Sequence, residues 1–117
     1  MPDNINNAGA AMADAMIHEF LLGFIKIYVL QYADREPVFG KEIHDKLSEH
    51  GYSISYGTLY NTFHSFEQKG YLVQEERNVN GKIRKYYTIT ALGREALDRA
   101  RTKTMELYEV ILETMKP

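Results

Sequence analysis

Apolar positions recur at helical spacing in the first part of the chain and predict two helices there. Over residues 13–33 apolar side chains occupy nearly every face of a helical wheel, so we expect this helix to have neighbours all round it. Pro37 lacks the backbone donor that would continue the helix. A second helix is expected over residues 40–50, because Gly51 follows at the position where helices commonly end.

A third helix is expected over residues 56–69, with Ser55 as its candidate N-cap. One narrow arc of this helix is apolar and is expected to be buried: Leu59, Phe63 and Phe66. The opposite side carries small polar side chains with almost no charge: Thr58, Asn61, His64, Ser65 and Gln68. Solvated helix faces usually carry Lys and Glu, so an uncharged polar face indicates a binding surface.

After the third helix the period of apolar positions changes to two, which predicts extended strands. Two such segments flank the Asn-Gly pair at residues 80–81, the strongest short-range signal for a β-hairpin. We expect Tyr87 and Ile89 of the second strand to face inward, because they pair best with Leu72 and Val73 of the first strand.

The hairpin gathers cations, although the chain as a whole has a net charge of −2. Four of them surround the turn with no acid among residues 77–90: Arg77, Lys82, Arg84 and Lys85. Electrostatic binding to nucleic acid depends on where cations are grouped and not on their sum. The hairpin is therefore expected to be a projecting wing whose cations reach DNA phosphates or the minor groove.

The last segment, residues 91–115, predicts one long helix with a coiled-coil seam. Apolar and small residues step along it by three and four, and others widen the seam: Leu97, Ala100, Thr104, Leu107, Tyr108, Ile111, Leu112 and Met115. At about 1.5 Å per residue the helix is roughly 37 Å long, more than the small core before it can cover. The simplest partner for the remainder is a second copy of the chain.

The order of elements predicts an α+β fold, a winged helix-turn-helix with three helices, a β-hairpin wing and a long C-terminal dimerisation helix. Residues 1–12 are expected to be a flexible N-terminal tail, residues 13–90 the winged-helix domain and residues 91–117 the dimerisation helix. With 117 residues the chain is one domain's length.

Three linked motifs resemble the PadR family of transcriptional regulators. They are Gly-x-x-Ile at residues 40–43, Gly-Thr-Leu-Tyr at residues 57–60 with Lys-Gly at 69–70, and Arg-Lys-Tyr-Tyr-x-x-Thr-x-x-Gly at residues 84–93. Their order and spacing also match, across about two thirds of the chain. Asn61 departs from the pattern, because family members commonly have proline there.

The resemblance implies a homodimer joined through the first and last helices, which binds a roughly palindromic operator on double-stranded DNA and usually represses transcription. It assigns these residues to the operator and the wing: Ser55, Tyr56, Gly57, Thr58, Tyr60, Arg84 and Lys85. The residue pattern adds four more DNA-binding candidates: Asn61, His64, Ser65 and Lys82. The candidate dimerisation residues are Phe20, Phe24, Leu97, Leu107, Tyr108, Ile111 and Leu112.

Other classes of function have little support in the residues. Cysteine is absent, which excludes thiolate metal sites and points to the cytoplasm, and the scattered histidines predict no metal site. No catalytic motif or cofactor-binding loop is found, so neither enzyme activity nor a cofactor is expected. The most apolar run, residues 20–30, is too short to cross a membrane.

Two alternatives to a plain DNA-binding repressor remain open. A winged helix can lose DNA binding and dock a protein partner through the same polar face. The first helix also carries aromatic side chains that could line a cavity for a small aromatic effector between subunits: Phe20, Phe24 and Tyr28. Core packing is the simpler interpretation of these three residues.

Overall fold

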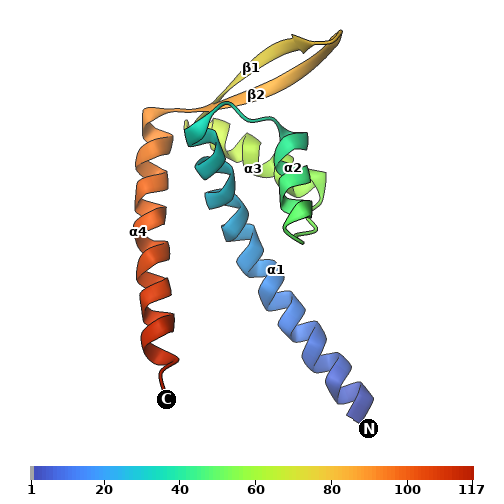
Figure 1. The fold of residues 1–117 in the computed structure, drawn as a ribbon. Helices are drawn as coiled ribbons and strands as arrows, with labels where there is room; N and C mark the ends of the chain where they lie inside the picture. The colour runs from blue at the N-terminus through green and yellow to red at the C-terminus, as the bar shows by residue number, and fades with distance from the viewer. Residues whose placement is uncertain (1) are drawn as a thin grey trace.

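The computed structural model describes residues 2–117 as four helices and one antiparallel hairpin (Figure 1). The elements follow in the order α1 (Pro2–Arg35), α2 (Gly40–Glu49), α3 (Tyr56–Gln68), β1 (Leu72–Val79), β2 (Lys82–Ile89) and α4 (Ala91–Thr114). This order confirms the predicted α+β winged helix-turn-helix with a long last helix. The hairpin projects from one end of the molecule, while α1 and α4 run away from it and diverge (Figure 1).

Helix α1 begins at Pro2, eleven residues before the start predicted at residue 13. Proline is well suited to the first turn of a helix, and the alanines at positions 8, 10, 11, 13 and 15 have high helix propensity, whereas the asparagines at 4, 6 and 7 and the glycine at 9 do not. A tail was expected here because the stretch lacks an apolar pattern, and that lack does not prevent a helix. The start of the helix is corrected accordingly, and the division of the chain into domains stays a prediction.

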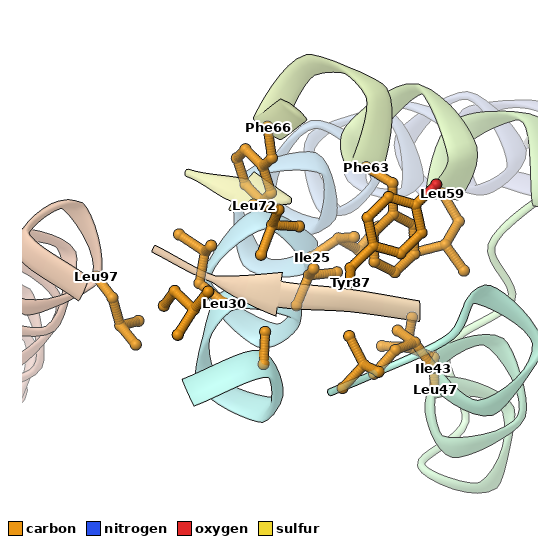
Figure 2. Close-up of a cluster of buried hydrophobic side chains, with 14 of the residues drawn as sticks. Ile25, Leu30, Ile43, Leu47, Leu59, Phe63, Phe66, Leu72, Tyr87 and Leu97 are labelled. Atoms are coloured by element: carbon orange, nitrogen blue, oxygen red, sulfur yellow. The ribbon is translucent and has the colours of Figure 1, made fainter. Parts of the chain in front are cut away.

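The core lies where α1, α2, α3, the root of the hairpin and the first turns of α4 meet (Figure 2). Its central members are all 5% exposed or less: Ile25, Leu30, Ile43, Leu47, Leu59, Phe63, Phe66, Leu72, Tyr87 and Leu97. The apolar arc predicted for α3 is therefore confirmed. Tyr87 stacks on Phe63 with ring centroids 4.4 Å apart, which joins the wing to the third helix.

Local signals in the sequence place the ends of α2 and α3. The Ser55 Oγ accepts a hydrogen bond of 3.1 Å from the Thr58 backbone N–H, which confirms the predicted N-cap. Gly51 and Gly70 follow the two helices with φ of 86° and 79°, in the left-handed region that glycine adopts without strain.

The hairpin closes through a two-residue turn at Asn80 and Gly81, whose φ values of 52° and 81° are those of a type I′ turn. The register pairs Leu72 with Ile89 and Gln74 with Tyr87. Tyr87 and Ile89 face the core as predicted, but Val73 does not, because it lies on the other face of the hairpin and is 55% exposed.

Helix α4 is anchored at its start and exposed along its second half. Thr90 caps it by accepting from the Gly93 N–H, and its hydroxyl also donates to the Gly70 carbonyl at 2.6 Å. Leu97, predicted to be part of the dimer seam, is fully buried in the core of its own chain. Its assignment to dimerisation is therefore wrong, because a side chain without exposed surface cannot contact a second subunit.

Ionic contacts hold the first half of α4 against the end of α1. Asp34 accepts hydrogen bonds from Arg94 Nε at 3.1 Å and from an Arg101 terminal nitrogen at 3.2 Å. Arg101 also donates to Gln31 at 2.9 Å. The hydrogen bond from Arg101, followed by that from Arg94, lowers the pKa of Asp34 below its usual value. Within residues 2–117 no helix is long and apolar enough to cross a membrane.

Candidate nucleic-acid interface

Helix α3 presents an exposed polar strip opposite its buried arc. Asn61, His64 and Gln68 are exposed and lie along the outside of the helix. Thr58 and Ser65, predicted to share that face, are only half-exposed, because they lie on the flank of α3 that turns toward α1. The uncharged face predicted from the sequence is thus divided into an outer strip and a flank.

The opposite flank of α3 carries an aromatic row. The rings of His44 and Tyr56 are stacked, with centroids 4.0 Å apart and planes 10° apart, and Tyr60 continues the row at 6.1 Å from Tyr56. Tyr56 and Tyr60 remain 42% and 50% exposed. A methyl group at Gly40 would lie 3.1 Å from the Tyr60 ring, so glycine at this position lets α2 approach Tyr60 closely.

A groove beside Tyr60 joins this flank of α3 to the wing. Its volume is about 500 Å³, and its lining comes from the start of α2, from α3 and from strand β2: Phe39, Gly40, Lys41, Tyr60, Lys82, Ile83, Arg84, Lys85 and Tyr87. Four of these side chains are cations, and none of the lining residues is an acid. We refer to it as the wing-side groove. It can accept an anionic, extended ligand such as a phosphate backbone.

The wing cations do not share one face of the hairpin. The register places Arg84 opposite Arg77, and the alternation of a strand puts Lys82 on that same face. Lys85 lies on the other face, the one that continues into the core through Tyr87. The three predicted wing cations therefore project in two directions from strand β2.

Aromatic rings and acids from neighbouring segments surround the wing cations. The guanidinium of Arg84 lies over the Phe39 ring at 4.6 Å and that of Arg77 over the Tyr86 ring at 4.5 Å, so these rings support the two cations. Strand β1 also brings Glu76 opposite Lys85. Glu75 Oε1 also accepts a hydrogen bond of 3.4 Å from Arg77 Nε. Residues 77–90 contain no acid, but strand β1 thus brings two acids beside their cations in space.

The polar side chains at the start of α3 are engaged in capping the helix. The Ser55 hydroxyl donates to Thr58 Oγ1 at 2.9 Å while it accepts from the Thr58 N–H, so the two side chains are engaged with each other. Gly57 is exposed, and a Cβ added there would meet only Ser55 Oγ, at 3.9 Å. A ligand can therefore approach the backbone at Gly57 without a steric clash.

Sequence reasoning missed Lys41 and Phe39, which line the wing-side groove. Phe39 directly precedes α2 and Lys41 lies in its first turn, and Val38 before them pairs with Tyr87 through backbone hydrogen bonds of 3.0 and 2.7 Å. This bridge brings the start of α2 to the edge of strand β2. No local sequence pattern predicts such a pairing, although Lys41 directly follows the glycine of the Gly-x-x-Ile motif.

The candidate dimerisation residues gather on the diverging parts of α1 and α4. Five of them are between 43% and 57% exposed: Phe20, Leu107, Tyr108, Ile111 and Leu112. Phe24 is half-buried and packs against Tyr52, with ring centroids 5.0 Å apart. Between the two helices lies an open apolar groove of about 440 Å³, lined by Phe20, Gly23, Phe24, Ile27, Tyr28, Gln31, Thr104 and Leu107.

Among the side chains that the structure describes, no group of three or more His, Asp and Glu is placed to hold a metal ion. Burial raises the pKa of the Tyr87 hydroxyl and of the Tyr28 hydroxyl. Burial thus favours the neutral form of both hydroxyls, in keeping with rings that pack in the core or against it.

Comparison with known proteins gives a consistent result. The family model described as "Transcriptional regulator PadR-like family" matches residues 29–99. The transcriptional regulator Rv3488 of Mycobacterium tuberculosis is 38% identical over 96 residues, which cover 82% of this chain and 90% of that protein.

Solved structures agree with the fold. The crystal structure of a PadR family transcriptional regulator from Eggerthella lenta superposes with a TM-score of 0.81 at 28% identity, covering 93% of this chain and 96% of that one. A PadR-like transcriptional regulator from Bacillus cereus superposes with a TM-score of 0.77 at 24% identity, covering 85% and 98% of the two chains. At that identity the second likeness bears on the fold alone.

Proposed function

This chain belongs to the PadR-like family of transcriptional regulators, and from that premise we propose that it binds promoter DNA as a homodimer and represses transcription by occupying the site. The operator is a roughly palindromic sequence, because a two-fold symmetric dimer presents the same surface twice. The protein acts in the cytoplasm, on double-stranded DNA, and without a cofactor.

One observation carries the proposal: Tyr60 of α3 and the cations of strand β2 line the same groove. The helix that fits a major groove and the hairpin that supplies positive charge are therefore adjacent, and a single duplex can meet both. Asn61 and His64 lie on the exposed strip beside Tyr60, where an amide side chain can pair with adenine. The wing-side groove then follows the phosphates of one strand.

The diverging helices support the dimer. Exposed apolar side chains on α1 and α4 face a groove that one chain leaves open, and a monomeric protein rarely exposes so continuous an apolar surface. A second copy that inserts its own α4 would cover these residues. Two copies of α3 would then enter successive major grooves about 34 Å apart.

The wing is tested by the double variant Arg84→Gln/Lys85→Gln. We expect weaker binding to all DNA sequences alike, and a slope of log affinity against log salt that falls by about 0.9 for each phosphate that the variant no longer neutralises. The matched control is Arg99→Gln/Lys116→Gln, which removes two exposed cations from α4 and the residues that follow it. If the wing variant bound as tightly as the control at moderate salt, the wing would have no part in DNA binding.

Asn61 is tested separately, because its expected role is base recognition. Replacing Asn61 by Ser should change which sites are enriched from a random DNA pool while leaving the salt dependence unchanged. A winged-helix protein-interaction module would enrich no motif from the same pool, so this experiment also separates that alternative from a DNA-binding regulator.

The apolar groove between α1 and α4 supports a second candidate function, that of a repressor that responds to a small aromatic effector. Its lining includes the aromatic rings of Phe20, Phe24 and Tyr28. A ligand that binds only the folded protein raises its unfolding temperature, so a screen of flat aromatic compounds by thermal shift tests this version. If no compound raised the unfolding temperature, the version with an effector would be wrong, and a repressor without an effector would remain.

A further inference from the structure

A second groove lies on the side of α3 that faces away from the wing. Its volume is about 370 Å³, and it runs between α1 and α3, lined by Leu22, Lys26, Thr58, Asn61, Thr62 and Ser65. We refer to it as the α1-side groove. Helix α3 is thus bordered by two grooves, each of which is lined by lysine and by no acid.

Several polar groups of the α1-side groove are engaged within α3. Thr62 Oγ1 donates to the Thr58 carbonyl at 3.1 Å, and Thr58 Oγ1 accepts from Ser55. By contrast, the side chains of Lys26, Asn61 and Ser65 make no hydrogen bond or ion pair with any side chain or backbone group that the structure describes. An ammonium and two uncharged polar groups therefore remain available around one shallow groove.

A helix that lies in the major groove has a sugar-phosphate backbone on each side of it. The wing-side groove, with Lys41, Lys82, Arg84 and Lys85, suits one of the two strands. The phosphates of the other strand must then pass along the opposite flank of α3. Lys26 is the cation that lines this flank.

We propose that Lys26 and Ser65 bind a backbone phosphate of the second DNA strand, so that each α3 is held between phosphates on both sides. The inference rests on the proposed DNA-binding function and adds a contact site on α1, outside the third helix and the wing. Lys26 supplies the charge, and the Ser65 hydroxyl supplies a hydrogen bond to a phosphate oxygen. Ser65 then positions the DNA backbone, although on a helical wheel it lies on the same side as residues that could contact bases.

The division of labour on α3 follows from where its side chains lie. Asn61 is exposed on the outer strip and also borders the α1-side groove, so it can reach base edges. Ser65 is half-exposed and turned toward α1, a position that suits phosphate and not the floor of the major groove. Lys26 is exposed and carries a long, flexible stem that can follow a phosphate.

The test compares Lys26→Gln with Lys116→Gln, which removes one exposed lysine just beyond the far end of α4. Binding is measured by fluorescence anisotropy over a range of salt, on a duplex enriched from a random pool and on a scrambled duplex. For Lys26→Gln we expect an affinity lower by about tenfold on both duplexes and a salt slope that falls by about 1.8, because each dimer neutralises two fewer phosphates. Lys26→Arg should bind nearly as the unaltered protein, because it keeps the charge.

A second readout locates the contact on the DNA. Single phosphates of the enriched duplex are replaced by neutral methylphosphonates, one position at a time on each strand. One position on the strand away from the wing should weaken the unaltered protein but weaken Lys26→Gln no further, as expected for interacting partners in a double-variant cycle. The same insensitivity in Ser65→Ala would support the shared phosphate.

The outcomes are distinguishable. If Lys26→Gln behaves as Lys116→Gln while the wing variant weakens binding, this inference is wrong and the proposed function stands. If Lys26→Gln weakens binding to only one of the two duplexes, Lys26 contacts bases and the phosphate assignment is wrong. If the Lys26 and wing variants are both silent, DNA binding through this face fails altogether. Circular dichroism and sedimentation of Lys26→Gln exclude loss of fold or of assembly as the cause.

Discussion

The winged-helix part of the chain buries its large apolar residues, whereas the diverging parts of α1 and α4 expose theirs. Among the side chains whose burial the structure describes, every large one that is fully buried lies between Ile25 and Leu97. The first half of α1 exposes Met16, at 72%, and Phe20 beyond it is 57% exposed; the second half of α4 is exposed throughout, with Leu107 at 53%. One region completes its core within a single chain, and the other does not.

Leu97 and Leu107 make the contrast within one helix. Both belong to the same pattern of three- and four-residue steps, yet the first is fully buried and the second is half-exposed. Figure 1 shows why: α4 starts beside the root of the hairpin and then separates from α1 along its length. A coiled-coil pattern therefore reports that a helix face will be covered, but not whether the same chain or a second copy covers it.

The largest effect is expected from breaking the exposed part of this pattern. In Leu107→Asp/Ile111→Asp the dimer should dissociate at working concentration, because burying each such side chain contributes about 1.5–3 kcal/mol and the two subunits together bury both residues twice. Affinity for a two-half-site duplex should fall by more than about 100-fold. Analytical ultracentrifugation reports the assembly and anisotropy the binding.

The control for that variant is Leu107→Met/Ile111→Leu, which conserves volume and apolar character and should remain a dimer. If the aspartate variant stayed dimeric, the second half of α4 would not be the interface, and the contrast between the two regions would lose its meaning.

A smaller effect is expected from the buried part of the pattern. Leu97→Ala should lower the free energy of unfolding by about 2–5 kcal/mol, because it leaves a cavity in the core that Leu97 shares with Leu30 and Leu72. Urea unfolding followed by circular dichroism measures this decrease. Under conditions where the variant is folded, its dimer should dissociate no more readily than the unaltered one. Dissociation without unfolding would place Leu97 in the subunit interface after all.

The smallest effect is expected at the contact that joins the two regions. Asp34 is ionised in its pairs with Arg101 and Arg94, and its pKa is lowered by folding. Its contribution to stability is therefore present above the ordinary carboxyl pKa, about 3.9, and disappears as the pH falls through the lower folded value.

In Asp34→Asn this contribution is absent at every pH. The urea midpoint should be slightly lower than that of the unaltered protein at pH 7, and the difference should shrink as the pH falls below the ordinary carboxyl pKa. If the difference between the two urea midpoints stayed constant over that range, the charge of Asp34 would contribute nothing to stability.

The sequence predicted the features that local chemistry determines. The Ser55 cap, the glycine after α3 and the two-residue turn at Asn80 and Gly81 each depend on neighbours within a few positions. Period alone also separated the buried arc of α3 from its polar side. The type and order of the elements, and the adjacency of helix and wing, could therefore be inferred without a structure.

Most of the features that the sequence prediction missed depend on contacts between segments that are apart in the chain. Glu76 lies opposite Lys85 through the register of the hairpin. Val73 is the exception: it lies outside because side chains alternate along a strand and its neighbour Leu72 is buried. Lys41 reaches the wing only because Val38 pairs with Tyr87, and Lys26 reaches α3 only because of how α1 crosses it. The candidate site was therefore predicted along α3 and β2 and missed on α1 and α2.

The central claim is that a symmetric dimer presents two copies of the face formed by α3 and the wing. The most direct test is selection of bound duplexes from a random pool by the full chain, followed by sequencing. We expect an inverted repeat whose half-site centres are separated by about one turn of DNA, roughly 10 base pairs, or a multiple of it. Enrichment of no motif, or of a single half-site bound by one copy, would contradict the claim.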